Sequence, residues 1–257
     1  MTPPGQGAEA PAGPPGPLSF TEMIREAWRL YRMRPLVVIP IFAALYLCVA
    51  LLAVSVAGQD RLAGSGRIVV GIAFQFGVPL AGTILTALAV VVMHDESVGN
   101  SSSLGSAWSG LAALWKELLA AALLAAIVSL VLYVPPLSII AVYIGSSGLS
   151  AVLFGPPLVI HAMVLERRSL AQSWVRTRAL MQGNWARVLL YWLTIALTVT
   201  VVGGLLTVPA QSVGTTTLLL VNGLILGVLV PYVAAFVLAS YLDVRAQHDR
   251  DAGEAPA

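Results

Sequence analysis

The chain has 257 residues, of which 58% are hydrophobic and only 10% are charged, and its formal net charge is +2. Because a soluble domain carries about 25% charged residues, this composition excludes a protein whose surface is covered mainly by water. Arginine far outnumbers lysine, and alanine is also abundant. This bias indicates a GC-rich bacterial genome rather than a nucleic-acid patch, so no nucleic-acid partner is expected.

The chain is expected to begin with a disordered tail. Residues 1–17 are rich in proline, glycine and alanine and have too few apolar side chains to offset the entropy of ordering. The first long apolar run starts near Leu36, which is too late for a signal peptide, so we expect it to be retained as a membrane anchor. This run contains the only cysteine, Cys48, so no intrachain disulfide can form.

Residues 20–34 have the pattern of an amphipathic helix. Four of its apolar side chains recur at the spacing of one helix face: Ile24, Ala27, Trp28 and Tyr31. Three arginines fall on another face: Arg25, Arg29 and Arg32. Ser19 or Thr21 can cap the helix at its start, and Pro35 ends it where the first apolar stretch begins.

Six stretches are long and apolar enough to cross about 30 Å of hydrocarbon as helices of roughly 20 residues. They are 36–57, 68–93, 118–134, 138–165, 188–208 and 218–241. We therefore expect an all-α polytopic membrane protein with one six-span domain over residues 18–245. The polar residues 246–257 are expected to form a disordered cytoplasmic tail.

Two further segments, 104–117 and 169–187, are predicted to be amphipathic helices between the apolar stretches. Four tryptophans lie in them: Trp108, Trp115, Trp174 and Trp185. The second segment also carries three arginines: Arg176, Arg178 and Arg187. Because tryptophan lies at headgroup depth and arginine reaches lipid phosphate, these helices either anchor the spans or form a surface for anionic lipid or a membrane-protein partner.

The basic residues predict the orientation. Twelve of the 14 lysines and arginines fall on one side of the six predicted spans, whereas Arg61 and Arg67 fall on the other. By the positive-inside rule the basic side is cytoplasmic, so both termini are expected in the cytoplasm of a bacterium, with the chain in its inner membrane.

A proline pattern predicts a threefold repeat. Phe-Gly-x-Pro-Leu occurs at 76–80 and at 154–158, and Val230-Pro231-Tyr232 follows at a similar interval. The predicted unit is an amphipathic helix, a span, a short outer loop and a span with a proline. Its three copies are 18–99, 100–165 and 166–245.

Kinked spans could line a central cavity, although prolines are also simply tolerated in membrane helices. The residues considered for a cavity or kink are Gln75, Pro79, Pro156, Pro157, His161, Asn222 and Pro231. Separately, Gly223 and Gly227 form a Gly-x-x-x-Gly motif, which permits close contact between helices.

No catalytic, metal-binding or cofactor-binding residue is predicted. His94 stands beside Asp95 and Glu96, a grouping typical of a solvated helix end, and His161 precedes Glu166 near the end of a span. An ionisable group at that depth is a candidate for a proton or substrate role. The sequence shows no nucleophile–base pair and no phosphate-binding glycine loop, so an enzyme is not expected.

The segment Leu18-Ser-Phe-Thr-Glu-Met-Ile-Arg-Glu-Ala-Trp-Arg-Leu-Tyr-Arg-Met-Arg-Pro35 resembles the opening of bacterial integral membrane proteins related to the glycerophosphoryl diester phosphodiesterase membrane domain. Residues 157–187, with Glu166 and Gly-Asn-Trp-Ala-Arg, and the exit at 241–246 fit the same family. The resemblance implies a multi-span membrane module that is sometimes fused to a phosphodiesterase domain. This sequence lacks the carboxylate and histidine metal ligands of that enzyme, so the resemblance does not imply the activity.

Two functions follow as hypotheses. The first is a non-enzymatic membrane module that acts as a scaffold or interacts with lipid or a partner. The alternative is a passive channel or transporter for a lipid-like or small apolar solute, through a cavity lined by the proline-bearing helices.

Overall fold

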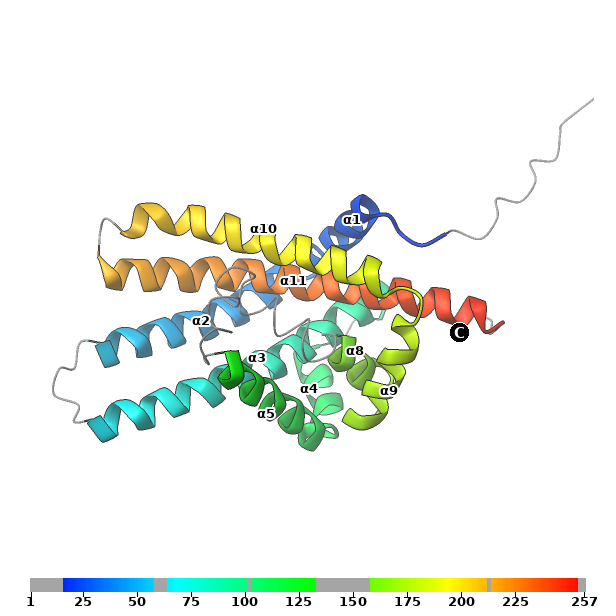
Figure 1. The fold of residues 1–257 in the computed structure, drawn as a ribbon. Helices are drawn as coiled ribbons and strands as arrows, with labels where there is room; N and C mark the ends of the chain where they lie inside the picture. Colours follow the sequence, from blue (N-terminus) through cyan, green and yellow to red (C-terminus); the bar gives the residue numbers. More distant parts are fainter. Residues whose placement is uncertain (1–15, 58–63, 101–102, 133–157, 212–213, 254–257) are drawn as a thin grey trace, which may run out of the picture.

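The computed structural model describes residues 16–57, 64–100, 103–132, 158–211 and 214–253, and the regular structure within these ranges is α-helical (Figure 1). The all-α class is confirmed for this part of the chain. The helices are α1 (Phe20–Tyr31), α2 (Pro35–Ala57), α3 (Gly64–Ser97), α4 (Leu104–Ala112), α5 (Trp115–Leu132), α8 (Leu158–Leu165), α9 (Leu170–Met181), α10 (Trp185–Gln211) and α11 (Thr215–Asp251). Pro156, Pro157 and most of the predicted span 138–165 lie outside the described residues.

Three short helices, α1, α4 and α9, each precede a longer apolar helix, and we call them the leading helices. The chain turns by 88° between α1 and α2 and by 84° between α4 and α5. After α9 the turn to α10 contains Gly183, whose φ of +83° is open to glycine at little cost. Residues 104–117 and 169–187 were predicted as continuous helices, which is wrong, because each contains such a turn. The helix predicted over 20–34 is present and ends at Tyr31.

All three leading helices begin with the same serine cap. The side chains of Ser19, Ser103 and Ser169 accept hydrogen bonds from the backbone N–H three residues later, at 3.4, 3.1 and 3.3 Å. In α1 and α9 a Glu or Gln side chain at that third position reaches back to the backbone of the cap, which completes a capping box. The start of each helix is therefore encoded locally.

The leading helices also share a register. In α1 and α9 the buried residues lie four, eight, eleven and twelve positions after the cap. They are Met23, Ala27, Leu30 and Tyr31 in α1, and Ser173, Thr177, Leu180 and Met181 in α9. The shorter α4 buries the first two of these positions, Ala107 and Leu111. Equal spacing of caps and buried faces indicates that these three segments are equivalent elements.

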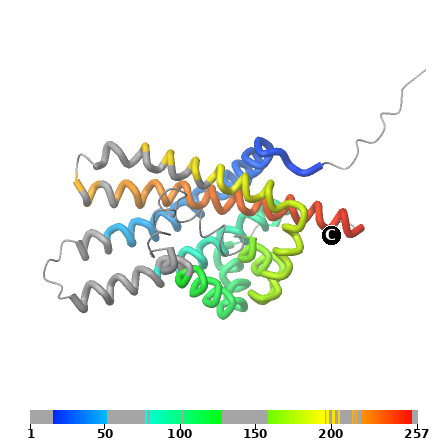
Figure 2. The backbone as a smooth tube through the Cα atoms, viewed as in Figure 1, coloured from blue at the N-terminus to red at the C-terminus, as the bar shows by residue number. Residues whose placement is uncertain are grey.

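The long helices form the body of the molecule. Figure 1 shows α10 and α11 antiparallel along one side, with α2 and α3 beside them and the leading helices toward the C-terminal end of α11; Figure 2 traces the same path. The main core joins Phe42 of α2, Met93 of α3, Trp192 of α10 and Phe236 of α11. A smaller core lies between α3, α4, α5 and α8 and contains Leu111 and Met163.

Helix α11 approaches α2 through the two glycines of its Gly-x-x-x-Gly motif. A Cβ at Gly227 would stand 2.5 Å from Cα of Ala43, and one at Gly223 would stand 3.0 Å from the carbonyl oxygen of Tyr46. Both distances leave no room for a side chain, so the two backbones meet directly. Such close approach is how apolar helices gain contact where lipid offers no hydrophobic driving force.

The described residues account for only part of the six predicted spans. Within the described residues, Leu80–Ser97 of α3 and Leu220–Asp251 of α11 are each long and apolar enough to cross a membrane. Counting each bent pair, α1 with α2 and α4 with α5, as one span raises the number from two to four. The apolar stretch Trp185–Ile195 of α10 is shorter.

The C-terminal end differs from its prediction. Residues 246–257 were expected to be disordered, but α11 continues to Asp251, so the first part of that segment is helical. The physical reason is that Gln247 and Asp249 bind arginines of α10 and α9. These contacts compensate for the polar composition that suggested disorder.

We expect Gly227→Ala to lower the free energy of unfolding by about 1–3 kcal/mol, because the new methyl group overlaps backbone atoms of α2. Thermal unfolding in detergent, followed by tryptophan fluorescence, measures the change. Gly82→Ala is the matched control, since a Cβ there meets open space and the substitution favours helix by about 0.5–1 kcal/mol. Equal midpoints for the two variants would contradict the close contact.

Candidate functional site at the charged end of the bundle

A buried carboxylate, Glu166, lies at the centre of a charged network just after α8. Its side chain is only 8% exposed, and its carboxylate lies 2.7 Å from Nε of Arg168 and 3.3 Å from Nε of Arg176. The hydroxyl of Tyr241 donates a hydrogen bond to the same carboxylate. Because a buried carboxylate is costly unless it is paired and hydrogen-bonded, these partners explain how Glu166 remains inside the structure.

The network continues from Glu166 to the end of α11. Arg176 of α9 also binds Asp249 at 3.1 Å, and Asp249 lies 3.6 Å from Arg245 on the next turn. Burial disfavours the charged form of Arg176, but Glu166 and Asp249 outweigh it and raise the pKa of this guanidinium above its ordinary value. Arg176 therefore stays charged and joins α9 to both α8 and α11.

A second polar cluster ties the beginning of the described chain to its end. Asp243 of α11 binds Arg187 of α10 at 3.1 Å and accepts a hydrogen bond from the backbone N–H of Leu18 at 3.1 Å. The hydroxyl of Tyr191 donates to the carbonyl of Leu18 at 3.3 Å. The segment before α1 is therefore held between α10 and α11.

Polar contacts also hold α3, α5 and α9. Arg34, in the turn before α2, binds Glu96 near the end of α3 at 2.9 Å. The backbone N–H of Leu170, at the start of α9, donates to the carboxylate of Glu117 on α5 at 2.7 Å. Sequence reasoning gave no role to Glu96, Glu117, Tyr241 or the acids of α11, although each acid stands near the polar end of an apolar helix.

The residues predicted to face lipid divide into two groups. Arg176 and Arg187 bind carboxylates within the bundle, with side chains only 18% and 21% exposed. The remaining members of the set are exposed: Arg25, Trp28, Arg29, Arg32, Trp108, Trp115, Trp174, Arg178 and Trp185. Arg29 among them pairs with Glu26 on the same helix.

The residues predicted to line a cavity do not share one of the pockets described below. His161 is 1% exposed and lies beside Tyr241, with the ring centroids 6.0 Å apart. Asn222 is exposed on α11, and Pro231 is buried within that helix. Gln75 and Pro79 belong to α3, but the structure does not describe their side chains.

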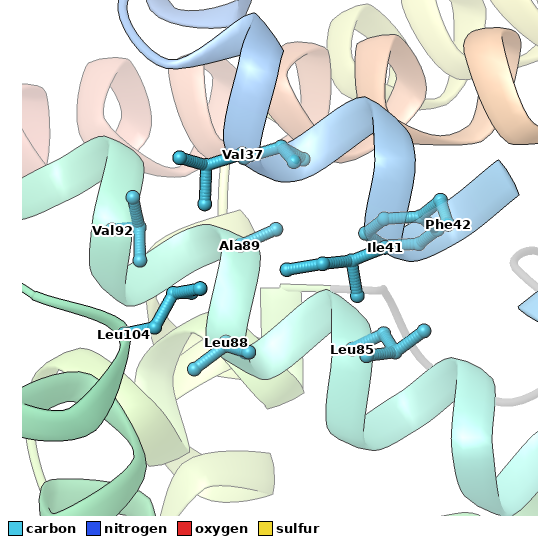
Figure 3. Close-up of a pocket in the computed structure, with 9 residues that line it drawn as sticks. Val37, Ile41, Phe42, Leu85, Leu88, Ala89, Val92 and Leu104 are labelled. Carbon is cyan, nitrogen blue, oxygen red and sulfur yellow. The ribbon is translucent and has the colours of Figure 1, made fainter. Parts of the chain in front are cut away.

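Between α2 and α3 the packing leaves only a small apolar gap of about 10 Å³ (Figure 3). Val37 and Ile41 of α2 face Leu85 and Ala89 of α3 across it, and Leu104 of α4 lies at one side. A space of this size and character is at the lower limit for one water molecule and offers it no polar partner. The described part of this interface is therefore closed to a solute.

Two larger pockets lie on either side of α4. One, of about 220 Å³, is polar in part and is lined by His94 and Asp95 of α3, Ser106 of α4 and Arg167 after α8. The other, of about 320 Å³, is an apolar groove between α3, α4 and α5. Among the described residues no group of three His, Cys, Asp or Glu side chains has the arrangement of a metal site.

We expect Glu166→Gln to destabilise the protein by about 3 kcal/mol, because it leaves the partly buried Arg176 with one carboxylate fewer. Thermal unfolding in detergent tests this expectation. Glu26→Gln is the control, since its pair with Arg29 lies on the exposed surface of α1 and is worth about 0.2–1 kcal/mol. A loss for Glu166→Gln no larger than that of the control would show that the network does not hold the bundle together.

No protein-family model matches this chain. No curated protein and no solved structure matches it either. The family resemblance therefore stays an expectation from the sequence.

Proposed function

We propose that the chain is a non-enzymatic integral membrane protein of the bacterial inner membrane, with six spans and both termini in the cytoplasm. Its role is that of a scaffold whose leading helices lie at the cytoplasmic interface and bind anionic lipid headgroups. The observation that carries this proposal is the exposure of tryptophan at the three turns where a leading helix meets a long helix.

Five of the six tryptophans are exposed, and each lies in a leading helix or is the first residue of the long helix that follows it. Their exposed fractions run from 40% to 57% in the set Trp28, Trp108, Trp115, Trp174 and Trp185. Large aromatic side chains with a polar N–H are favoured where one end of the ring is apolar and the other is wet. Their repeated placement supports an interfacial position for amphipathic helices α1, α4 and α9.

The charges support the same orientation. The arginines that do not face lipid are used inside the bundle, as Arg176 and Arg187 show. Arg25, Arg32 and Arg178 remain exposed on α1, in the turn after it and on α9. These three supply the positive charge for anionic headgroups, at about 1 kcal/mol for each basic residue near the surface.

A scaffold is favoured over a channel by the packing of the long helices. Where the structure describes both helices, the α2–α3 interface leaves a gap of only about 10 Å³, and α11 meets α2 at backbone contact through Gly223 and Gly227. Dense contacts of this kind suit a rigid support for other molecules. They leave little space for a solute between these helices.

The proposed topology predicts which sites are reached from outside the cell. In a Cys48→Ser background, which removes the exposed native cysteine, Leu62→Cys should react with a membrane-impermeant maleimide in intact cells. Ala252→Cys, on the exposed last turn after α11, should react only after lysis. Reaction of both positions, or of neither, in intact cells would refute the orientation.

The lipid role predicts an effect of the exposed arginines. The triple variant Arg25→Gln, Arg32→Gln, Arg178→Gln should retain phosphatidylglycerol over phosphatidylcholine at least tenfold less than the parent, because three positive charges are removed. Native mass spectrometry after extraction from mixed nanodiscs measures the ratio. The triple lysine variant keeps the charge and should retain the preference, and about 1 M salt should abolish it in every form.

Unchanged retention in the glutamine variant would count against a lipid-binding surface and would favour a purely structural role for the leading helices.

A further inference from the structure

The apolar groove of about 320 Å³ beside α4 is built from residues paired at one-turn spacing on three helices. Leu80 and Ile84 come from α3, Trp108 and Ala112 from α4, and Trp115 and Leu119 from α5. Residues four apart lie on one helix face, so each helix presents a continuous apolar strip to the groove. The groove is therefore lined by one apolar face from each of the three helices.

The bend between α4 and α5 creates the groove. The two helices meet at 84°, and α3 closes the angle between them. Leu80 and Ile84 belong to the stretch Leu80–Ser97, which is long and apolar enough to cross a membrane. A groove along this stretch lies at the depth of lipid hydrocarbon if α3 spans the bilayer.

One positive charge stands at the edge of the groove. Nζ of Lys116 lies 5.8 Å from the ring centroid of Trp115, which lines the groove, and Lys116 is the only lysine of the chain. The neighbouring carboxylate of Glu117 is bound by the backbone N–H of Leu170. The acid next to Lys116 is therefore already engaged by α9, and the lysine supplies the charge that a bound anion would meet.

The size of the groove indicates the kind of occupant. Ligand pockets begin at about 300 Å³, so the groove is large enough for a flexible hydrocarbon chain. Its lining is apolar on all three helices, which suits a hydrocarbon occupant. An apolar groove with one ammonium group at its edge matches an acyl chain whose headgroup is anionic.

We propose that this groove binds one acyl chain of an anionic membrane phospholipid, whose phosphate is held by the ammonium group of Lys116. Trp108 and Trp115, which both line the groove, would contact the chain. The proposal rests on the membrane location proposed above and adds a defined lipid site to it.

The test compares two neighbouring exposed alanines. Ala112 lines the groove, whereas Ala113, the residue that caps α4, is not among its lining residues. Ala112→Phe should lower the retention of phosphatidylglycerol at least tenfold in native mass spectrometry of protein extracted from mixed nanodiscs, and Ala113→Phe should leave it unchanged. Equal retention in the two variants overturns the proposal. It is also overturned if Ala112→Phe, but not Ala113→Phe, folds poorly while phosphatidylglycerol is still retained, because that result would mean that protein covers the groove.

The charge is tested separately. Lys116→Gln should reduce the preference for phosphatidylglycerol over phosphatidylcholine about fivefold, and Lys116→Arg should restore it. No change in Lys116→Gln would overturn the assignment of the phosphate to this lysine.

A measurement without any groove-filling variant guards against misfolding. Phosphatidylglycerol brominated in the middle of its acyl chain should quench Trp108 and Trp115 more strongly than Trp28 and Trp185. Two double variants are compared. One carries Trp108→Phe with Trp115→Phe, and the other carries Trp28→Phe with Trp185→Phe. An equal loss of quenching in the two overturns the proposal. If cysteine labelling supports the topology while these lipid tests fail, the groove is excluded and the membrane proposal stands. Failure of the labelling refutes the proposed orientation, whatever the lipid tests show.

Discussion

The arrangement of the helices depends on the charged end of α11. This helix carries Asp243 and Asp249, which bind arginines of α10 and α9, and Tyr241, which donates to the buried Glu166. Its other half meets α2 through glycines without intervening side chains. Helix α11 thus combines an apolar contact determined by shape with a polar contact determined by charge. The ion pairs and hydrogen bonds of the polar contact help to fix the rotation of α11 about its own axis. Contacts between apolar helices are weakly directional, whereas an ion pair with hydrogen bonds has a defined geometry.

The repeated leading helices show how a local signal gives the same element with different side chains. The cap positions of α1 and α9 are both serine, and the third residues, Glu22 and Gln172, complete the same capping box. The buried positions then differ in character: Met23 and Ala27 in α1 correspond to Ser173 and Thr177 in α9. The equivalence extends into the next helix, since Val38 and Val188 are both buried nineteen residues after their caps. Cap and turn determine the geometry, and the packing surface adapts to the neighbour it meets.

The sequence predicted the class and most helix positions because those depend on local or compositional signals. The apolar stretches and the serine caps are visible without knowledge of the fold, and α2 begins within a residue of its predicted start. The partners of Arg176 and Arg187 could not be predicted, because Asp249 and Asp243 lie 73 and 56 residues away in the chain. A charge pattern on one helix gives no information about a carboxylate that the fold brings to it. For the same reason the tail after Arg245 was expected to be disordered: its polar residues fold because of contacts made elsewhere.

The arginines divide into those that pair with carboxylates inside the bundle and those that stay exposed. This division limits the number of positive charges that a lipid-binding surface can present. An arginine paired with a buried carboxylate is held inside the bundle, so it contributes to the fold and adds little to attraction for an anionic headgroup. Arg176 and Arg187 belong to that class, although their spacing with tryptophan on one segment resembles that of a lipid-binding helix. Among the described residues the exposed cations are spread over several elements: α1 and the turn after it, the start of α5, the turn after α8, α9 and the end of α11. Sparse charges cannot hold many lipids firmly, since each contributes about 1 kcal/mol. A single groove that adds apolar contact to one of these charges would bind a lipid more strongly than any exposed arginine does alone, and the junction of α3, α4 and α5 has that combination.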